Sequence, residues 1–123
     1  SDCDLVNLHW ICNEFISIHQ IKKINKPIVW SLYDMWAFSG AEHYSDSNRY
    51  IEGYLKNNRN KDEKGFDINK WVWMRKLKNF NFQFPLVAPS EWLKDCVKKS
   101  FIFKDFKIHK IGHAIDINKW GYY

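Results

Sequence analysis

The sequence predicts an α/β fold, a Rossmann-like three-layer domain built on a short parallel sheet. Four short apolar runs have the length of buried strands, and segments with helical periodicity separate them. This alternation is typical of βαβ units, whose strands pair in parallel. The 123 residues, of which 46% are apolar and 18% aromatic, provide enough material for one core. We therefore expect a single domain over residues 1–123.

The first third of the chain has the pattern strand, helix, strand. A short buried strand is expected within Asp4–His9, which ends in polar residues. The next helix is predicted from apolar residues at a three-residue spacing: Phe15, Ile18, Ile21 and Ile24. It ends before Pro27, because the residue that precedes a proline is pushed out of the α region. Ile28–Leu32 is then expected to form a strand that is buried on both faces.

The middle of the chain is first polar and then helical. We expect an exposed loop or insertion over residues 45–70, because a connection of this length in a compact domain is usually functional or disordered. A helix begins near the end of that segment and carries both aromatic and basic residues: Trp71, Trp73, Met74, Arg75, Lys76 and Lys78. The pattern is compatible with a lid over a crevice and with an insertion that has no function.

The last third contains two more strands with a helix between them. Phe84–Ala88 is expected to be the third strand, and Lys107–Ile111 the fourth. Between them, Ser90 is placed to cap the helix. The apolar face of this helix is predicted to consist of Trp92, Leu93, Cys96 and Val97.

Charge and cysteine content restrict the function only weakly. The chain has 19 basic and 14 acidic residues, a net charge of +5, and its basic residues are spread from Lys22 to Lys119. Nucleic acid, an anionic membrane and a phosphorylated substrate would all be attracted by this charge, but a solvated lysine-rich surface is the simpler explanation. Three cysteines without paired spacing argue against a disulfide framework or a zinc site, and favour a cytoplasmic location. No apolar run approaches the length of a membrane span, and the first residues lack the pattern of a signal peptide.

Polar residues at the expected strand ends are the first candidates for function. In open α/β sheets, ligands bind beyond the carboxyl ends of the strands. His9 follows the first strand, and Tyr33 and Asp34 follow the second. A purely structural role is also open for His9, as a partner of a neighbouring loop, and for Asp34, as the cap of a turn.

The loop after Asp34 is the expected binding loop. Trp36 and Phe38 offer aromatic faces for a sugar ring, although core packing is the expected role of one of them. Glu42, His43 and Tyr44 place a carboxylate, an imidazole and a phenol in succession, which suits sugar hydroxyls or a phosphate. These residues lack a third metal ligand at a readable spacing, so no metal site is predicted.

Arginines and a helix start are the candidates for binding a phosphate. Arg59 is one of three arginines that can pair with phosphate in a bidentate manner, the others being Arg49 and Arg75. Ser90 is expected to act chiefly as a helix cap, but a helix N-terminus beside the crevice also favours an anion.

Taken in order, the motifs resemble those of a GT-B glycosyltransferase of family 4, the retaining group that uses nucleotide-sugars. The matching pieces cover nearly the whole chain: NLHW at 7–10, KPIVWSLYDMWAFSGAEHY at 26–44, EGY at 52–54, NR at 58–59, GFDINKWVWMRK at 65–76, VAPSEWLKDCVKKS at 87–100 and IGHAID at 111–116. The resemblance is to part of the N-terminal, acceptor-side domain, in a branch that has a GAEHY loop. It implies that the fold is part of the N-terminal half of a GT-B enzyme.

The resemblance also implies roles for single residues. It places the reaction centre at His9, Tyr33 and Asp34, and the substrate-binding residues at Trp36, Glu42, His43, Tyr44, Arg59 and Ser90. Many relatives carry a histidine where Tyr33 stands here. Tyrosine has an ordinary pKa near 10 and is a poor base at neutral pH. Gly112, His113 and Ala114 also replace the Pro-Asn-Gly that is usual in the family.

The function implied by the resemblance is retaining glycosyl transfer in bacterial surface polysaccharide or lipopolysaccharide biosynthesis. The acceptor is expected to be a sugar or a lipid-linked sugar, with the enzyme in the cytoplasm and in peripheral contact with the inner membrane. The nucleotide-sugar is a co-substrate bound by a C-terminal domain that this sequence does not contain, so the chain alone is expected to be inactive. No cofactor, metal or nucleic acid is expected. One alternative is a non-catalytic carbohydrate- or protein-binding remnant, and a more distant one is a nucleic-acid-binding protein.

Overall fold

Four parallel strands form the sheet of this protein, in the order in which they occur in the chain. The computed structural model describes residues 2–12 and 15–120. β1 (Val6–His9), β2 (Ile28–Ser31), β3 (Leu86–Ala88) and β4 (Ile108–Lys110) lie side by side in the order β1-β2-β3-β4. Val6 is paired with Ile28, and Leu86 with both Trp30 and Ile108. The predicted α/β class with a short parallel sheet is therefore confirmed.

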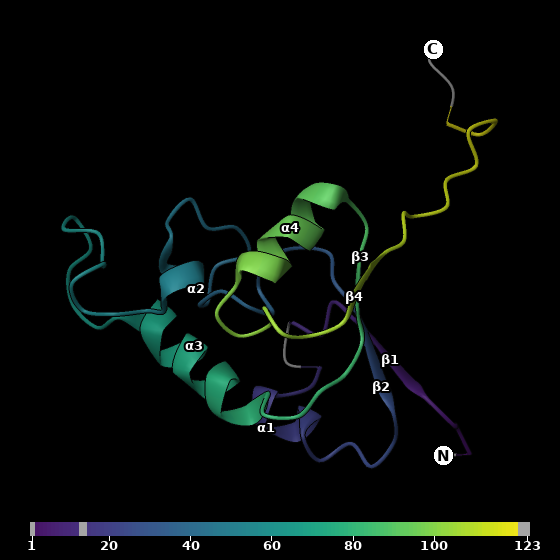
Figure 1. Ribbon diagram of the computed structural model, residues 1–123, viewed down its shortest axis with the longest axis horizontal. Coiled ribbons are helices and arrows are strands. Elements are labelled where there is room, and N and C mark those ends of the chain that lie inside the picture. The colour runs from purple at the N-terminus through teal and green to yellow at the C-terminus, as the bar shows by residue number, and fades with distance from the viewer. Residues whose placement is uncertain (1, 13–14, 121–123) are drawn as a thin grey trace.

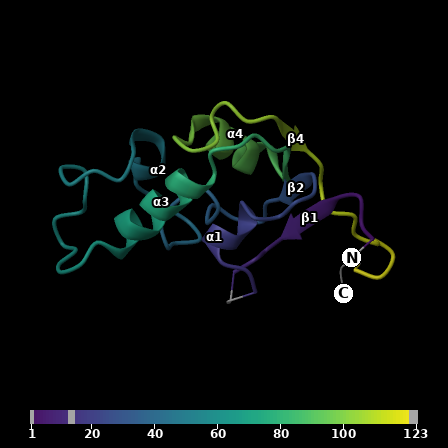
Figure 2. The ribbon, with the colours of Figure 1, turned by 90° about the horizontal axis from the view of Figure 1, so that it is seen from below.

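Four helices are described, all in the connections between strands. α1 (Ile18–Ile21) connects β1 to β2, α2 (Arg49–Glu52) and α3 (Ile68–Asn79) lie between β2 and β3, and α4 (Glu91–Lys99) connects β3 to β4. Ser90 caps α4 as predicted, because its side chain accepts a hydrogen bond from the backbone N–H of Leu93. Parallel strands in sequential order with right-handed crossovers require all connections on one face of the sheet. Figures 1 and 2 show the helices on one side of the strands.

One face of the sheet is accordingly buried, and the other is open. Leu8, Ile28, Trp30 and Leu86 point into the core. On the other face Val29 and Val87 are half-buried outside the core, and His109 is exposed. The expected burial of the second strand on both faces is therefore wrong, because the described residues place no helix over its second face. Of the three layers that the sequence predicts, the structure describes two: the sheet and one layer of helices.

The core is mainly aromatic. Trp30 of β2 packs edge-on against Phe80 and Phe103, with ring centroids 5.4 and 6.3 Å apart. Phe84 contacts Phe103 at 6.0 Å between centroids, and Phe103 has no exposed surface. Burying such large rings removes much apolar surface from water, which supports a sheet of very short strands.

Several boundaries and faces differ from the prediction. α1 has only four residues, and Phe15, expected on its apolar face, is 84% exposed. Trp92 is 55% exposed, because it shares the solvent side of α4 with Asp95 and Lys99. Leu93, Cys96 and Val97 of the same helix are buried as predicted.

The segment 45–70 is more ordered than a polar loop. It contains α2, and Arg49, Tyr50 and Tyr54 are buried. The Arg49 guanidinium donates two hydrogen bonds to Asp67, the shorter being 2.7 Å, so that the two ends of the segment are joined. The expectation of an entirely exposed loop is therefore wrong. Among the described residues, no helix has the length and apolar character needed to cross a bilayer.

Candidate functional site

A hydrogen-bonded pair, Asp34 and His43, occupies the carboxyl edge of the sheet. Nδ1 of His43 lies 2.5 Å from Oδ2 of Asp34. An ionised carboxylate only accepts hydrogen bonds, so Nδ1 must donate, and the lone pair of a neutral imidazole is then on Nε2. Asp34 is held in place because its Oδ1 accepts from the backbone N–H of Trp36 at 2.9 Å. The geometry is that of an imidazole whose tautomer and orientation are set by a carboxylate.

Trp10 contacts both members of this pair, and its backbone conformation is unusual. Its φ of 29° lies in the left-handed region, which a bulky side chain rarely adopts. In that conformation its indole N–H donates to Oδ2 of Asp34 at 3.3 Å, and its ring stacks on His43 with 6.1 Å between centroids. Backbone strain of this kind is commonly found at functional sites.

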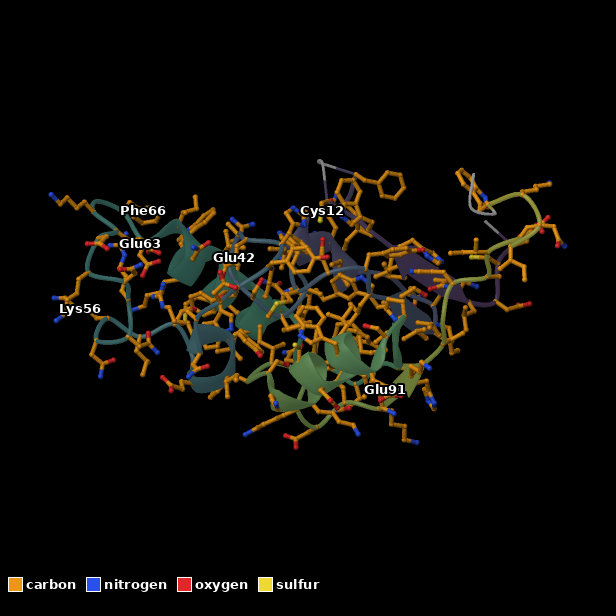
Figure 3. All side chains as sticks on the ribbon, turned by 90° about the horizontal axis from the view of Figure 1, so that it is seen from above. Cys12, Glu42, Lys56, Glu63, Phe66 and Glu91 are labelled. Carbon is orange, nitrogen blue, oxygen red and sulfur yellow. The ribbon has the colours of Figure 1, made fainter. Side chains whose placement is uncertain are left out.

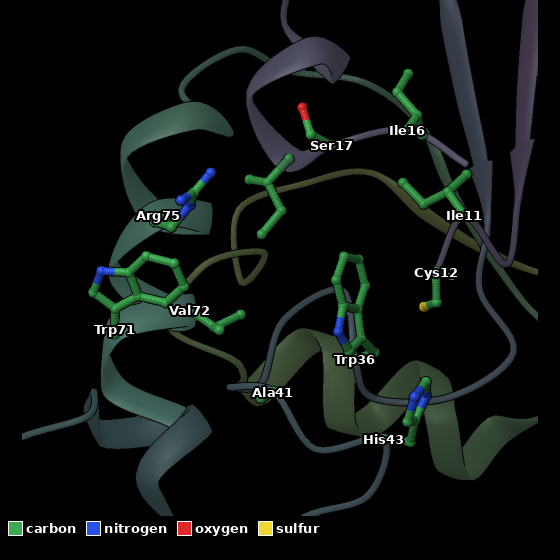
Figure 4. A pocket seen from close by; sticks show the side chains of 11 residues that line it. Ile11, Cys12, Ile16, Ser17, Trp36, Ala41, His43, Trp71, Val72 and Arg75 are labelled. Atoms are coloured by element: carbon green, nitrogen blue, oxygen red, sulfur yellow. The ribbon is translucent and has the colours of Figure 1, made fainter. Parts of the chain in front are cut away.

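A groove of about 780 Å³ lies next to His43, between the connection from β1 to α1 and helix α3. Figure 4 shows Trp36 and His43 on one side of it, and Trp71 and Arg75 from α3 on the other. The remaining walls are mostly apolar: Ile11, Cys12, Ile16, Ser17, Ile18, Ala41 and Val72. The groove thus combines aromatic walls with one oriented imidazole and one guanidinium.

Lys76 holds the loop that carries Trp36 and His43. The Lys76 side chain has no exposed surface, and its ammonium donates to the backbone carbonyls of Trp36, Ser39 and Gly40. The same Nζ lies 3.9 Å from the centroid of the Trp36 ring, which adds a cation–π contact. Burial lowers the pKa of Lys76 to about 7, although the nearby Glu42, Cys12 and Asp34 act in the opposite direction.

Gly40 and Glu42 bring this loop against α3. A Cβ atom at Gly40 would lie 2.5 Å from Oε2 of Glu42 and 2.6 Å from Cβ of Asn69, so only glycine fits. Oε1 of Glu42 accepts a hydrogen bond from the hydroxyl of Tyr54. Burial and this bond to Glu42 raise the pKa of Tyr54. Glu42 is therefore engaged with Tyr54.

His9 and Tyr33 form a second group, separate from Asp34. Nδ1 of His9 and the Tyr33 hydroxyl form a 2.9 Å hydrogen bond, and the Tyr33 ring stacks on His113 with 4.9 Å between centroids. These three residues line a smaller cavity of about 120 Å³ on the side of β3 and Pro89. The three predicted catalytic residues are thus divided between two places, and only Asp34 lies beside the larger groove.

The remaining predicted binding residues are not gathered at the groove. Tyr44 is 63% exposed and lies near Trp92, with 6.1 Å between centroids. Arg59 donates to the backbone carbonyl of Gly65 at 2.8 Å and pairs with Glu63. The Ser90 hydroxyl caps α4. Although Glu42, His43 and Tyr44 are consecutive, their side chains contact three different partners.

Sequence reasoning missed three residues of this site. Trp10 stands only within the NLHW motif, and Trp71 and Lys76 stand only among the aromatic and basic residues of a predicted helix. A signal for Lys76 exists in hindsight, because it is three residues from Trp73 and so shares its buried side of α3. No group of three or more metal-ligating side chains is found within residues 2–12 and 15–120.

Comparisons of the chain with protein-family models, with curated proteins and with solved structures found no match. A functional assignment therefore depends on the sequence motifs and on the geometry described above.

Proposed function

We propose that this chain forms the acceptor-binding part of a retaining, nucleotide-sugar-dependent glycosyltransferase that acts in bacterial surface polysaccharide or lipopolysaccharide biosynthesis. The motif resemblance supports the proposal, and the pairing of Asp34 with His43 beside an aromatic groove is the observation that carries it. An oriented imidazole next to a tryptophan face suits a sugar, which presents hydroxyls at its rim and an apolar face to the ring.

In this proposal the acceptor sugar lies in the groove and donates a hydroxyl hydrogen bond to Nε2 of His43. The ring of Trp36 packs against the sugar, and Asp34 stabilises the positive charge when His43 takes the hydroxyl proton. Arg75 at the opposite wall is available for a phosphate of the acceptor. The nucleotide-sugar is the co-substrate, bound by a second domain, and the scheme requires no cofactor or metal.

His43, rather than Tyr33, is the base in this scheme. Tyr33 stands where many relatives carry a histidine, and its hydroxyl is bonded to His9. Tyr33 and His9 are therefore assigned to positioning at the edge of the site, with His113 stacked beside them.

Sugar binding by the chain itself tests the proposed groove. Saturation-transfer NMR with monosaccharides and oligosaccharides should show contact in the wild type, weakened by up to about tenfold in His43→Gln and Asp34→Asn, the effect of losing one hydrogen bond to the sugar. His109→Gln, on the open face of the sheet, is the matched control and should bind as the wild type does. Unchanged binding in His43→Gln would contradict the assignment.

Transfer itself requires a second measurement. Labelled sugar transfer from a nucleotide-sugar is followed with the chain alone, and again with a donor-binding domain supplied. Activity only in the second case supports the enzyme proposal. Saccharide binding without transfer in either case supports the alternative of a non-catalytic carbohydrate-binding remnant. That alternative also fits the hydrogen bond between His9 and Tyr33, which engages two of the expected catalytic residues with each other.

A further inference from the structure

Helix α3 exposes apolar residues to solvent. Ile68, Trp71 and Met74 are 52%, 47% and 48% exposed, and their three-residue spacing places them on one side of the helix. The opposite side is buried and includes the ammonium of Lys76. An ordinary surface helix has apolar residues only on its core side, whereas α3 buries Trp73 on that side and also exposes apolar residues on the other. An exposed apolar side rimmed by polar residues marks an interaction surface.

Phe66 extends this apolar surface beyond the start of α3. It is 71% exposed, and its ring centroid lies 6.4 Å from that of Trp71. Figure 3 shows Phe66 at the end of the molecule where Lys56 also lies. The Arg75 guanidinium lies 4.8 Å from the centroid of the Trp71 ring, so a cation borders the aromatic residues. Because Trp71 and Arg75 also line the groove, the apolar surface is continuous with it.

The net charge of the chain is concentrated in the same segment. Residues 55–79 contain eight basic and three acidic residues, and the rest of the chain contains eleven of each, so this segment accounts for the whole net charge of +5. Of the three acidic residues, Glu63 pairs with Arg59 and Asp67 with Arg49. Basic residues occur along most of the sequence, but their excess over acidic residues lies within residues 55–79.

We propose that residues 55–79 bind the surface of an anionic lipid bilayer. The exposed apolar side chains enter the interfacial layer: Phe66, Ile68, Trp71 and Met74. The exposed basic side chains contact lipid phosphates: Lys56, Lys61, Lys64, Arg75 and Lys78. Tryptophan and basic residues around an apolar helix side are typical of helices that lie in the membrane interface.

Lipid explains this surface better than nucleic acid does. A nucleic acid would use the basic residues and the aromatic rings, but Ile68 and Met74 offer no face on which a base stacks. A bilayer offers hydrocarbon for these side chains and phosphate for the lysines. The inference goes beyond the proposed function and does not depend on it. If both hold, the groove opens at the membrane surface, where a lipid-linked acceptor would be presented.

Cosedimentation with vesicles tests the proposal. Vesicles of phosphatidylcholine with about 30 mol% phosphatidylglycerol are compared with vesicles of phosphatidylcholine alone, at low and raised salt. We expect binding to the anionic vesicles at least about tenfold tighter than to neutral ones, and weaker at raised salt. The double variant Lys61→Glu/Lys64→Glu should weaken this binding by about tenfold or more, because each basic residue near the surface contributes about fivefold. Phe66→Ser/Met74→Ser should also weaken it.

Matched variants on α4 control for composition and folding. Lys98→Glu/Lys99→Glu reverses two exposed lysines and Trp92→Ser removes an exposed aromatic residue, and both should bind vesicles as the wild type does. Circular dichroism verifies that each variant is folded. The proposal is overturned by no binding to anionic vesicles, by equal losses in the α3 and α4 variants, or by binding to RNA without binding to vesicles. No sugar is present in the assay, so its failure is distinct from a failure of the proposed function.

Discussion

His43 donates a hydrogen bond from Nδ1 to Oδ2 of Asp34 over 2.5 Å, although the two residues are nine positions apart. The backbone supports the contact, because the Met35 N–H donates to the carbonyl of His43 at 2.8 Å and closes the loop between them. This loop converts two polar residues into one unit, an imidazole with a defined tautomer. The proposed function depends on this unit, and its geometry can be tested without any substrate.

The tautomer of His43 provides the first prediction. In the wild type, long-range proton–nitrogen NMR of the neutral imidazole should show the proton on Nδ1, since the carboxylate of Asp34 only accepts. Asp34→Asn lets the amide donate to the ring, which should shift the population towards the Nε2–H tautomer. His109 is the internal reference in the same spectra and should not change. An unchanged His43 in Asp34→Asn would show that the pair is not formed in solution.

Lys76 provides a prediction about pH. Its pKa is lowered by burial to about 7, whereas in the unfolded chain it is near its ordinary value of 10.5. Between these values the unfolded state binds up to one more proton, so stability should rise with pH, with a slope that approaches about 1.4 kcal/mol per pH unit. Urea unfolding from pH 7 to 8.5 should show this slope in the wild type.

The comparison with two variants isolates the effect of Lys76. Lys76→Met should lose the slope, while Lys78→Met, at an exposed position of the same helix, should retain it. Equal slopes in all three proteins would mean that the three carbonyls keep the Lys76 ammonium charged throughout this range.

The buried pair of Arg49 and Asp67 provides a prediction about stability. The Arg49 side chain is 5% exposed, and besides Asp67 it bonds Asn58 and the carbonyl of Leu55. Arg49→Met should destabilise the fold by roughly 3–5 kcal/mol, because it removes the buried guanidinium from Asp67 and leaves that carboxylate only the more distant Arg59, whose Nε is 3.7 Å away. Thermal unfolding measures this. Arg75→Met, at an exposed arginine, should change stability by less than about 0.5 kcal/mol, and a similar loss in both would argue against a specific role of the pair.

Gly40 provides a prediction about loop packing. Gly40→Ala should cost roughly 1–3 kcal/mol, since its Cβ would overlap Glu42 and Asn69. It should also displace His43, which the NMR signals of the His43 ring can report. Gly112→Ala is the control, because the nearest atom to its Cβ is 3.9 Å away. Wild-type stability in Gly40→Ala would show that the loop and α3 are not in close contact.

Local sequence patterns were sufficient for the elements but not for their exposed faces. Ser90 could be predicted as a cap because capping involves only the next three residues. Phe15 and Trp92 were placed on apolar faces by spacing alone, yet both are exposed. Spacing shows which residues share a side of a helix, but the sheet and the neighbouring helices decide which side is buried.

The sequence by itself determined the α/β class, the four short parallel strands and the position of Asp34 after the second strand, because these depend on local apolar runs and turn residues. Only the tertiary structure decided that Asp34 pairs with His43, that Lys76 is buried beneath their loop, and that α3 turns Trp71 outward. The physical reason is that such contacts depend on the relative positions of distant elements. Lys76 and Gly40 are 36 residues apart, and their contact exists only when α3 packs beneath the loop.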